Sequence, residues 1–502
     1  MKNQVQLIAY VDRLGGTLPG LRDLLRGPLA GLFGGVHLLP FFDPIDGADA
    51  GFDPIDHAAV DRRLGSWRDV RRIADTTDVM ADLIVNHISC RSPQFRDFLA
   101  HGSHSAWSGM FLSYDDVFPG GATEQDLQAI YRPRPGLPFT VMNFGDGTQR
   151  RLWTTFTAEQ IDLNVTHPAG QAYLDSILRT LSAGGVSSVR LDAIGYAIKQ
   201  AGTSCFMLPE TYAFIAGLAS RAAGLGLEVL VEIHSWYQDQ IDIARRVGWV
   251  YDFALPPLVL HALFMQSSRA LKHWIGIRPV NAVTVLDTHD GIGVIDIGAD
   301  QRAPGTRPGL VPDDELDALV EQIHLNSRDE SRLATGAAAS NLDLYQVNCT
   351  YFDALGRDEL KYLLARAIQF FVPGVPQVYY VGLFAGSNDM ELLARTGVGR
   401  DINRHHFGQE EITDAIARPV VQRLFDLIRL RNSHPAFDGQ FAMAPTSDTV
   451  LELSWRNGNA HARLRVDFAT LDYRIDFSRD GSAASLVLGP DQPGGRNRVR
   501  LT

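Results

Sequence analysis

Acidic and basic side chains stand at the ends of short apolar segments of this sequence. VRLDA places Arg190 and Asp192 two residues apart, and VEIH places Glu232 and His234 in the same relation. Side chains two apart on a β-strand point to the same face of a sheet. A third segment, LDTHD, ends with Asp290. If these segments are strands of one sheet, their carboxylates meet at one edge of it.

Three more polar residues occupy comparable places. His289 precedes Asp290, His87 closes DLIVNH, and Asp49 lies in the polar, glycine-containing loop DGADAGFDPIDH. Paired carboxylates suit glycosidic chemistry: one attacks or stabilises the oxocarbenium-like carbon, and the other, kept protonated, gives a proton to the leaving oxygen. Arg190 would keep Asp192 ionised. A single such carboxylate could equally cap a helix or pair with an arginine, so the hypothesis depends on their convergence.

The elements that would position these residues recur along the chain. Short apolar segments, each followed by a polar or glycine cluster and a helical pattern, begin at Val5, Gly35, Met80, Val186, Glu228, Trp249, Asn281 and Val375. Near-continuous apolar strands alternating with helices predict a parallel sheet covered on both faces. Eight such units predict an α/β fold, a (β/α)₈ TIM barrel with its active site at the carboxyl ends of the strands.

Two spacings between strands are far longer than the others, from Met80 to Val186 and from Asn281 to Val375. They predict insertions after barrel strands 3 and 7, and loops of this length are usually functional. Beyond about Asn432, alternating segments such as TVLELSWRNG predict a C-terminal antiparallel β domain. The expected limits are 1–86, 169–291 and 356–434 for the barrel, 87–168 for a lid-like first insertion, 292–355 for the second, and 435–502 for the β domain.

Composition narrows the class of protein. Hydrophobic residues make up 45% and charged residues 21%, which is ordinary for a globular chain, and the net charge of −12 leaves no broad basic face. We therefore expect no nucleic-acid partner. Cys90, Cys205 and Cys349 are widely spaced and favour free thiols over a disulfide framework. The first residues lack a signal-peptide pattern, and no apolar run reaches the roughly 18 residues of a membrane helix, so we expect a cytoplasmic protein without a membrane partner.

Several longer motifs make a family resemblance visible. DLIVNH, VRLDAIG, EVLVEIHS and LDTHDGIGVID resemble the four strand regions of the α-amylase superfamily, glycoside hydrolase family 13. DGADAGFDPIDH, IYRPRPGLPFT, PGVPQVYYVG and GRDINRH are similar to the sucrose phosphorylases within that superfamily, and the similarity extends over nearly the full chain. The C-terminal β domain is the least similar part.

The resemblance implies an activity and a set of residues for it. The activity is reversible, retaining phosphorolysis of sucrose to α-D-glucose 1-phosphate and D-fructose through a β-glucosyl-enzyme. Asp192 would be the nucleophile, Glu232 the general acid/base and Asp290 the transition-state stabiliser. The residues holding the glucosyl unit would be Asp49, His87, Arg190, His289 and Arg400. Phe52 would offer an apolar face to the sugar, or alternatively anchor its loop.

A phosphorylase must attract a phosphate dianion close to these carboxylates, and this requires local positive charge. The candidates are Arg134 in RPRPG and His234, together with Tyr345 in NLDLYQ. In the resembled family the loops holding Arg134 and residues 342–346 are expected to shift between a fructose-binding and a phosphate-binding arrangement. Asp343 would contact fructose and then withdraw. The remaining acceptor residues would be Leu342 and Gln346.

We expect no cofactor and no metal, with inorganic phosphate as a co-substrate. The sequence lacks zinc spacing, EF-hand, P-loop and dinucleotide motifs. Many α-amylases hold a structural calcium near the position of Asn86, but sucrose phosphorylases do not depend on it. Arg132 is interpreted as a solvated residue of the first insertion, and His57 and His405 as structural.

Four functions remain distinguishable by experiment. The first is sucrose phosphorylase, with sucrose, phosphate, glucose 1-phosphate and fructose as its small-molecule partners. The second is a related phosphorylase for sucrose 6′-phosphate, glucosylglycerol or glucosylglycerate. The third is a sucrose hydrolase or transglucosylase, and the fourth a catalytically inactive sugar-binding protein, against which the intact carboxylates argue. Homodimers occur in the resembled family, so a homodimer is one expected assembly.

Overall fold

A closed parallel barrel forms the centre of the molecule in the computed structural model, which describes residues 1–47, 49–133, 136–300, 307–335, 346–479, 483–488 and 500–501. Within these residues eight strands close in the order β1-β16-β13-β12-β11-β10-β5-β2. Their bounds are β1 Gln6–Ala9, β2 Gly35–Leu38, β5 Asp78–Ile84, β10 Ser188–Asp192, β11 Glu228–Val231, β12 Trp249–Asp252, β13 Ala282–Thr284 and β16 Val375–Tyr379. The predicted (β/α)₈ barrel is confirmed, and each strand lies in an apolar segment named above.

The barrel strands are largely apolar, and several of their buried polar side chains are paired with one another. All residues of β1, β2 and β16 are buried, as parallel strands covered on both faces should be. Strands β5 and β10 run in register, with Asp82 opposite Arg190 and Ile84 opposite Asp192. His37 of β2 completes this group, with Nε2 3.1 Å from Asp82 Oδ2. These polar residues therefore form a buried layer directly beneath the carboxyl ends of the strands.

Helices cover the outside of the barrel. The connections supply α1 Leu18–Arg26, α2 Trp67–Ala74, α6 Pro168–Ala183, α7 Pro209–Ala223, α8 Tyr237–Ala244, α9 Leu255–Phe264, α10 Arg269–Ile277 and α14 Glu359–Phe371. After β16 come α15 Tyr380–Leu383, α16 Met390–Thr396, the 3₁₀ turn η3 Gly399–Asn403, α17 Gln409–Ala417 and α18 Pro419–Ser433. Helices α6, α7 and α18 each begin with proline, a residue whose fixed φ suits the first helical turn.

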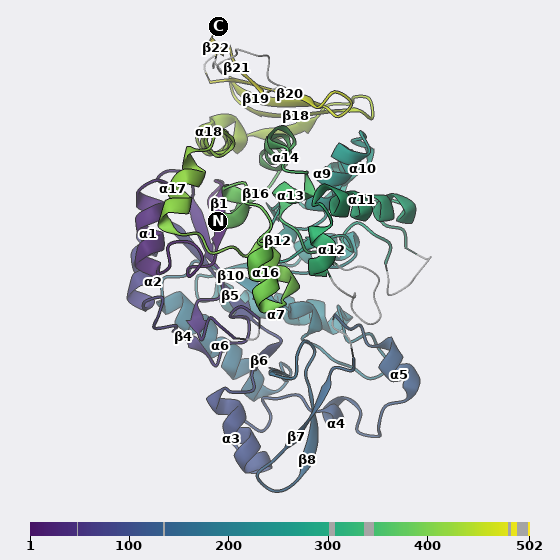
Figure 1. Cartoon of the computed structure of the whole chain (residues 1–502). Helices are drawn as coiled ribbons and strands as arrows, with labels where there is room; N and C mark the ends of the chain where they lie inside the picture. Colours follow the sequence, from purple (N-terminus) through teal and green to yellow (C-terminus); the bar gives the residue numbers. More distant parts are fainter. Residues whose placement is uncertain are drawn as a thin grey trace.

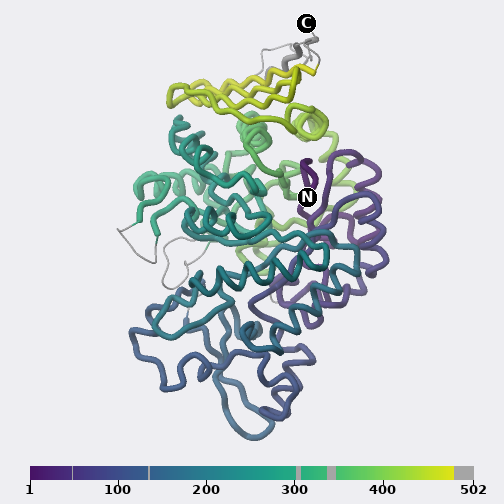
Figure 2. Tube along the Cα trace, turned by 180° about the vertical axis from the view of Figure 1, so that it is seen from behind, coloured from purple at the N-terminus to yellow at the C-terminus, as the bar shows by residue number. Residues whose placement is uncertain are grey.

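The long connection after β5 forms a separate lobe, which is at the bottom of Figure 1 and again in the reverse view of Figure 2. It contains β6 His87–Ser89, α3 Pro93–His101, α4 Tyr114–Val117, α5 Glu124–Ala129, β7 Phe139–Asn143, β8 Gln149–Trp153 and β9 Gln160–Asp162. Strands β6 and β9 are antiparallel and place His87 opposite Asp162. This two-stranded ladder joins the lobe to the end of β5. A shorter hairpin, β3 Phe42–Asp43 with β4 Asp56–Val60, lies after β2.

The connection after β13 carries a second set of elements. They are β14 Ile292–Gly293, α11 Asp313–Asn326, α12 Glu330–Thr335, β15 Gln346–Val347 and α13 Tyr351–Ala354. Strands β14 and β15 pair antiparallel, with Gly293 opposite Gln346. This pairing fixes the residue that directly follows 341–345, a segment outside the described residues.

An antiparallel sheet follows α18, as predicted. Its order is β17 Gln440–Met443, β18 Val450–Asn457, β19 Ala460–Asp467, β20 Asp472–Ser478, β21 Ala483–Leu488 and β22 Arg500–Leu501. It lies at the opposite end of the molecule from the first lobe, beyond α14 and α18. Trp455 of β18 donates its indole N–H to the carbonyl oxygen of Phe371 at the end of α14, 2.7 Å away. The sheet is thus docked far from the barrel's catalytic end.

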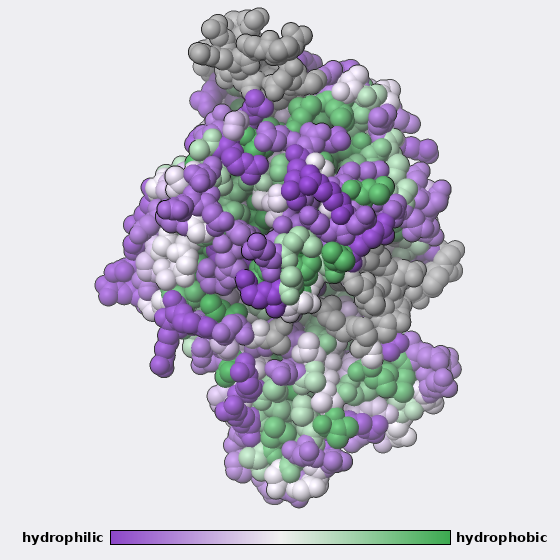
Figure 3. Space-filling view, in the orientation of Figure 1, coloured by the Kyte–Doolittle hydropathy of each residue, from purple (hydrophilic) through white to green (hydrophobic). Residues whose placement is uncertain are grey.

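The surface is mixed in character. Figure 3 shows hydrophilic side chains over much of the barrel, with apolar side chains interspersed, notably over the lower lobe. Among the described residues no helix combines the length and the apolar character that a bilayer crossing requires.

Candidate active site

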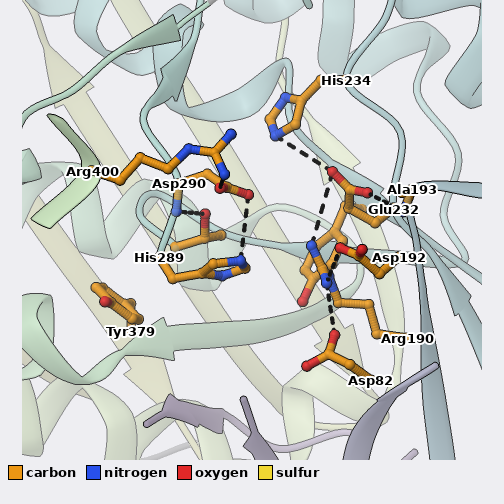
Figure 4. Close-up of polar contacts among 12 residues, drawn as sticks. Asp82, Arg190, Asp192, Ala193, Glu232, His234, His289, Asp290, Tyr379 and Arg400 are labelled. Carbon is orange, nitrogen blue, oxygen red and sulfur yellow. Dashed lines mark hydrogen bonds and ion pairs between the residues drawn. The ribbon is translucent and has the colours of Figure 1, made fainter. Parts of the chain in front are cut away.

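A pocket opens at the carboxyl ends of the barrel strands. Most of the residues singled out from the sequence line it: Asp49, Phe52, His87, Asp192, Glu232, His234, His289, Asp290, Gln346 and Arg400. They come from loops or strand ends distributed around the barrel and from both insertions. Arg190 lies just beneath, buried and in contact with the carboxylates (Figure 4).

Asp192 is the last residue of β10, and the chain turns sharply after it. Ala193 has φ 54°, a left-handed conformation that costs free energy for a residue with a Cβ atom. Its N–H donates to Glu232 Oε2 at 3.4 Å. The turn therefore directs the Asp192 carboxylate into the pocket and fixes its distance from Glu232, which follows the end of β11.

Arg190 organises the charges beneath the pocket. Its Nη1 lies 2.7 Å from Asp82 Oδ1 and 3.0 Å from Asp192 Oδ1, and its Nη2 lies 3.9 Å from Glu232 Oε1. Although burial raises the pKa of Asp82, His37 and Arg190 lower it to about 2, so this carboxylate is ionised at neutral pH. Asp82 therefore holds the guanidinium in place without competing for a proton.

Asp192 and Glu232 both lie beside Arg190. Burial raises the pKa of Asp192 well above its usual range, Arg190 opposes this, and the charge of Glu232 raises the pKa further. Arg190 contacts Asp192 at 3.0 Å and Glu232 only at 3.9 Å, and the closer cation favours the ionised form. We therefore assign the negative charge to Asp192.

Asp290 is held ionised by a second arginine. Arg400 Nη1, from η3, lies 2.8 Å from Asp290 Oδ1. Burial raises the pKa of Asp290, but Arg400 and then His289 lower it below its ordinary value. His289 is buried, which lowers its pKa to about 3 and keeps it neutral. Its ring stacks on Phe52, with centroids 4.8 Å apart and planes 10° apart. Phe52 is 4% exposed and lines the pocket, so it is both an apolar wall and a packed anchor.

His87 is fixed by the junction between the barrel and the first lobe. Its Nε2 lies 2.9 Å from the carbonyl oxygen of Phe52. Behind it the buried Lys199 Nζ contacts Asn86 Oδ1 at 2.6 Å and Asp162 Oδ2 at 2.5 Å. An ammonium group therefore holds the oxygens of Asn86 and Asp162 together. The sequence gave no indication of this role for Lys199, because its partners are distant in the chain.

Four of the expected acceptor and phosphate residues lie outside the described residues, namely Arg134, Leu342, Asp343 and Tyr345. His234 and Gln346 are described, and both are buried and line the pocket. The pocket also contains Pro133, Phe156 and Tyr196, which the sequence reasoning did not single out. Tyr196 could have been found as the aromatic residue in the turn after Asp192, and Phe156 as one of the aromatics of the first insertion.

One group of side chains has the composition of a metal site. Ligand atoms of Glu232, His234 and Asp290 lie within 4.8 Å of one another. Glu232 and Asp290 are also the residues for which the sequence predicted acid/base and charge-stabilising roles. Residues Asn86 and Asp162 are already bridged by Lys199, so their oxygens face a cation that belongs to the chain. The absence of a metal remains a prediction, which a chelator tests below.

Solved structures define the class. The crystal structure of sucrose 6F-phosphate phosphorylase from Thermoanaerobacter thermosaccharolyticum matches with a TM-score of 0.89 and 38% identity, covering 97% of this chain and 99% of that one. An α-amylase from H. orenii matches with a TM-score of 0.67 at 15% identity, covering 95% and 92%, which shows the shared fold alone. The barrel, its lobe after the third strand and the carboxylates at the strand ends thus define an α-amylase-type enzyme of glycoside hydrolase family 13.

Curated relatives define the family more closely. Sucrose phosphorylase of Agrobacterium vitis is 61% identical over 491 residues, covering 96% of this chain and all of that protein. Sucrose phosphorylase of Bifidobacterium adolescentis is 55% identical over 468 residues, covering 93% and 92%. The chain belongs to the sucrose phosphorylase family. No protein-family model matches it.

Proposed function

We propose that this protein catalyses the reversible phosphorolysis of sucrose to α-D-glucose 1-phosphate and D-fructose with retention of configuration. The observation that carries the proposal is the arrangement of charges around Arg190. It contacts Asp192 at 3.0 Å and Glu232 at 3.9 Å, and so favours an ionised Asp192 beside an acid that can donate a proton. The 61% and 55% identical relatives named above support sucrose as the substrate.

The first half of the reaction forms a glucosyl-enzyme. Asp192 attacks the anomeric carbon as the bond to the fructosyl oxygen breaks, and the proton of Glu232 goes to that oxygen. Positive charge develops on the sugar ring, and ionised Asp290 stabilises it from its place beside Arg400. Asp49, His87, His289 and Arg400 line the pocket where the glucosyl unit would lie.

Phosphate completes the cycle. One of its oxygens attacks the anomeric carbon from the face opposite Asp192, the bond to Asp192 breaks, and the Glu232 carboxylate takes up the phosphate proton. Two inversions give net retention. The entering anion must approach three carboxylates, so the basic residues at the acceptor side decide between phosphate and water. Of these, His234 is described and lies with Nε2 4.0 Å from Glu232 Oε1. Arg134 and Tyr345 are proposed to share this role.

A product assay with and without phosphate tests the proposal. With sucrose and phosphate we expect glucose 1-phosphate and fructose in equal amounts, and without phosphate we expect sucrose consumption to fall sharply. Undiminished consumption with release of free glucose would show a hydrolase instead. Products in which glucose is joined to a second sugar would show a transglucosylase.

The preferred acceptor needs its own comparison, because glucosylglycerol phosphorylase of Marinobacter adhaerens is 41% identical and the structural match above acts, by its name, on sucrose 6F-phosphate. Phosphate consumption should be measured with sucrose, sucrose 6′-phosphate, glucosylglycerol and glucosylglycerate in parallel. We expect sucrose to give the highest kcat/KM. A higher kcat/KM for another substrate would instead make the protein a phosphorylase for that substrate within the same family.

We further propose a cytoplasmic enzyme that needs no metal or organic cofactor and that assembles as a homodimer. Activity should persist after dialysis against a chelator. A loss that added divalent cation restores would instead assign a metal to Glu232, His234 and Asp290. Sedimentation equilibrium on the full chain tests the dimer, for which a monomer mass is the contrary result.

A further inference from the structure

A buried ion pair lies directly behind the acceptor side of the pocket. His234 Nδ1 is 2.7 Å from Oδ2 of Asp296, which follows β14 in the second insertion. Asp296 is fully buried. Its other oxygen, Oδ1, accepts the N–H of Ser235 at 3.2 Å and Nε2 of Gln240 at 3.0 Å. These three donors come from the segment that follows β11 and from α8.

The imidazole ring has no freedom to turn. Phe253 stacks on it with centroids 3.8 Å apart and planes 16° apart. Gly293 leaves the space in which the ring and the carboxylate meet, because a Cβ atom there would come within 2.2 Å of Asp296 Oδ2 and 2.8 Å of His234 Nδ1. Gly293 also pairs with Gln346 across β14 and β15. The ion pair is therefore built into the same ladder that positions the acceptor side of the pocket.

The hydrogen bond between His234 and Asp296 determines which nitrogen of the imidazole ring carries a hydrogen. An ionised carboxylate only accepts hydrogen bonds, so Nδ1 of His234 carries a hydrogen. Nε2, on the pocket side, then carries a hydrogen only when the ring is positively charged. A neutral ring would present a lone pair to an entering anion and repel it, whereas a charged ring would donate to it.

We propose that Asp296 is a positioning residue for phosphate: it fixes His234 in the orientation, and maintains the charge, with which Nε2–H binds the entering anion. This inference rests on the proposed phosphorolysis and deepens it. Burial alone lowers the pKa of His234, but Asp296, then Glu232 and Asp290, raise it above its ordinary value. These three carboxylates are the charged groups that face the ring from the second insertion, from the segment after β11 and from the segment after β13.

The test uses Asp296→Asn in the full-length enzyme. Asparagine keeps an oxygen that can accept from Nδ1 but removes the charge that stabilises the charged ring. We expect the KM for phosphate to rise about tenfold or more. The rate of sucrose hydrolysis without phosphate should stay nearly unchanged. We also expect phosphate use to decline at a lower pH than in the unchanged enzyme. The titration of phosphate itself is the same for both proteins and cancels in the comparison.

A matched control and a second variant make the result decisive. Asp242→Asn removes a half-exposed carboxylate of α8 that pairs with Arg245, and it should leave both activities unchanged. Gly293→Ala places a methyl group between Asp296 and His234 and should raise the KM for phosphate as Asp296→Asn does. Thermal unfolding identifies any variant that does not fold. If Asp296→Asn does not fold, Gly293→Ala carries the test.

The two possible failures differ. If the unchanged enzyme consumes sucrose equally without phosphate, the proposed function is wrong. If it requires phosphate but folded Asp296→Asn and Gly293→Ala keep the same KM for phosphate and the same pH profile, only the role of Asp296 is wrong. An equal loss of phosphorolysis and hydrolysis in both variants would likewise overturn it, since it would indicate a general structural effect.

Discussion

Asp82 binds Arg190 inside the barrel, with Oδ1 2.7 Å from Nη1, and the same nitrogen reaches Asp192, the proposed nucleophile, at 3.0 Å. Both Asp82 and Arg190 are buried. The position of the reacting carboxylate thus depends on a partner that never contacts substrate. His37 completes the group and, with Arg190, outweighs the effect of burial on the pKa of Asp82.

Replacing Asp82 by Asn should impair both stability and catalysis. Removing one partner of a buried ion pair typically costs about 3–5 kcal/mol, and because Asp192 still contacts Arg190 we expect a loss near the lower end of this range. We expect urea unfolding to show such a loss and kcat to fall. Asp46→Asn, at an exposed pair with Arg63, is the control and should cost at most about 1 kcal/mol. An Asp82→Asn variant as stable and active as the control would show that Arg190 does not need this partner.

Replacing the nucleophile should abolish turnover without unfolding the protein. Asp192→Ala removes the atom that forms the covalent intermediate, so we expect kcat to fall by several orders of magnitude. The melting temperature should stay the same or rise, since a buried carboxylate that other carboxylates repel is removed. Near-normal turnover by this variant would refute the assignment.

Glu232→Gln should affect the departure of fructose most. The amide cannot protonate the leaving oxygen, and general acid catalysis contributes about 10²–10⁴-fold. A donor that needs no protonation, such as α-glucosyl fluoride, should therefore recover much of the lost rate with phosphate as acceptor. Equal losses on sucrose and on the fluoride would require another role for Glu232.

Lys199→Met should loosen the junction between the barrel and the first lobe. It leaves the buried Asp162 carboxylate without its ammonium partner, although Thr155 still donates to it through N–H and Oγ1. We expect a loss of about 3–5 kcal/mol of unfolding free energy. The KM for sucrose should rise, because His87 lies opposite Asp162 in the β6–β9 ladder. Lys361→Met, at a partly exposed pair with Asp358, is the matched control.

Acidification should begin to destabilise the protein below about pH 6.5, where ordinary carboxylates are still ionised. Burial lowers the pKa of His57 to about 4 and that of His289 to about 3, whereas both titrate near 6.5 when unfolded. The unfolded chain therefore binds more protons below pH 6.5, so this stabilisation is present above 6.5 and is lost as pH falls. His234, with a raised pKa, has the opposite sign and contributes only below its own folded pKa.

Urea unfolding between pH 6.5 and 5 measures this dependence. Each of the two histidines should contribute about 1.4 kcal/mol per pH unit once the unfolded group is protonated. His57→Gln should remove one such contribution and make the slope shallower, whatever its effect on the absolute stability. A slope unchanged by this substitution would show that His57 is protonated in the folded protein.

Local pattern was sufficient for the barrel strands and for the residues at their ends. Segments such as VRLDA contain both the apolar residues that form a strand and the charged residues at its end, so one segment predicts both the strand and the site residues. The two-residue strands β14 and β15 were not foreseeable, because two residues show no periodicity.

The partners of site residues were harder to find than the residues themselves. Asp296 reads as an ordinary loop carboxylate, and only the folded chain brings it to His234. The sequence also does not indicate that Gly293 leaves the space for this contact, since glycine is common in loops. Lys199 resembles any lysine after a strand until the lobe folds back over the barrel. Long-range pairing of this kind depends on tertiary contacts, which a single sequence does not encode locally.

The ammonium group of Lys199 determines in which solutions the junction between the barrel and the first lobe keeps its structure. The cation that joins Asn86 to Asp162 is covalently part of the chain, so its local concentration is fixed and does not depend on solution composition. A diffusible ion at the same oxygens would leave when its free concentration fell or when a competing anion removed it. Phosphate is such an anion, because it sequesters divalent cations. A protein that works with phosphate as a reactant therefore benefits from a junction that phosphate cannot remove.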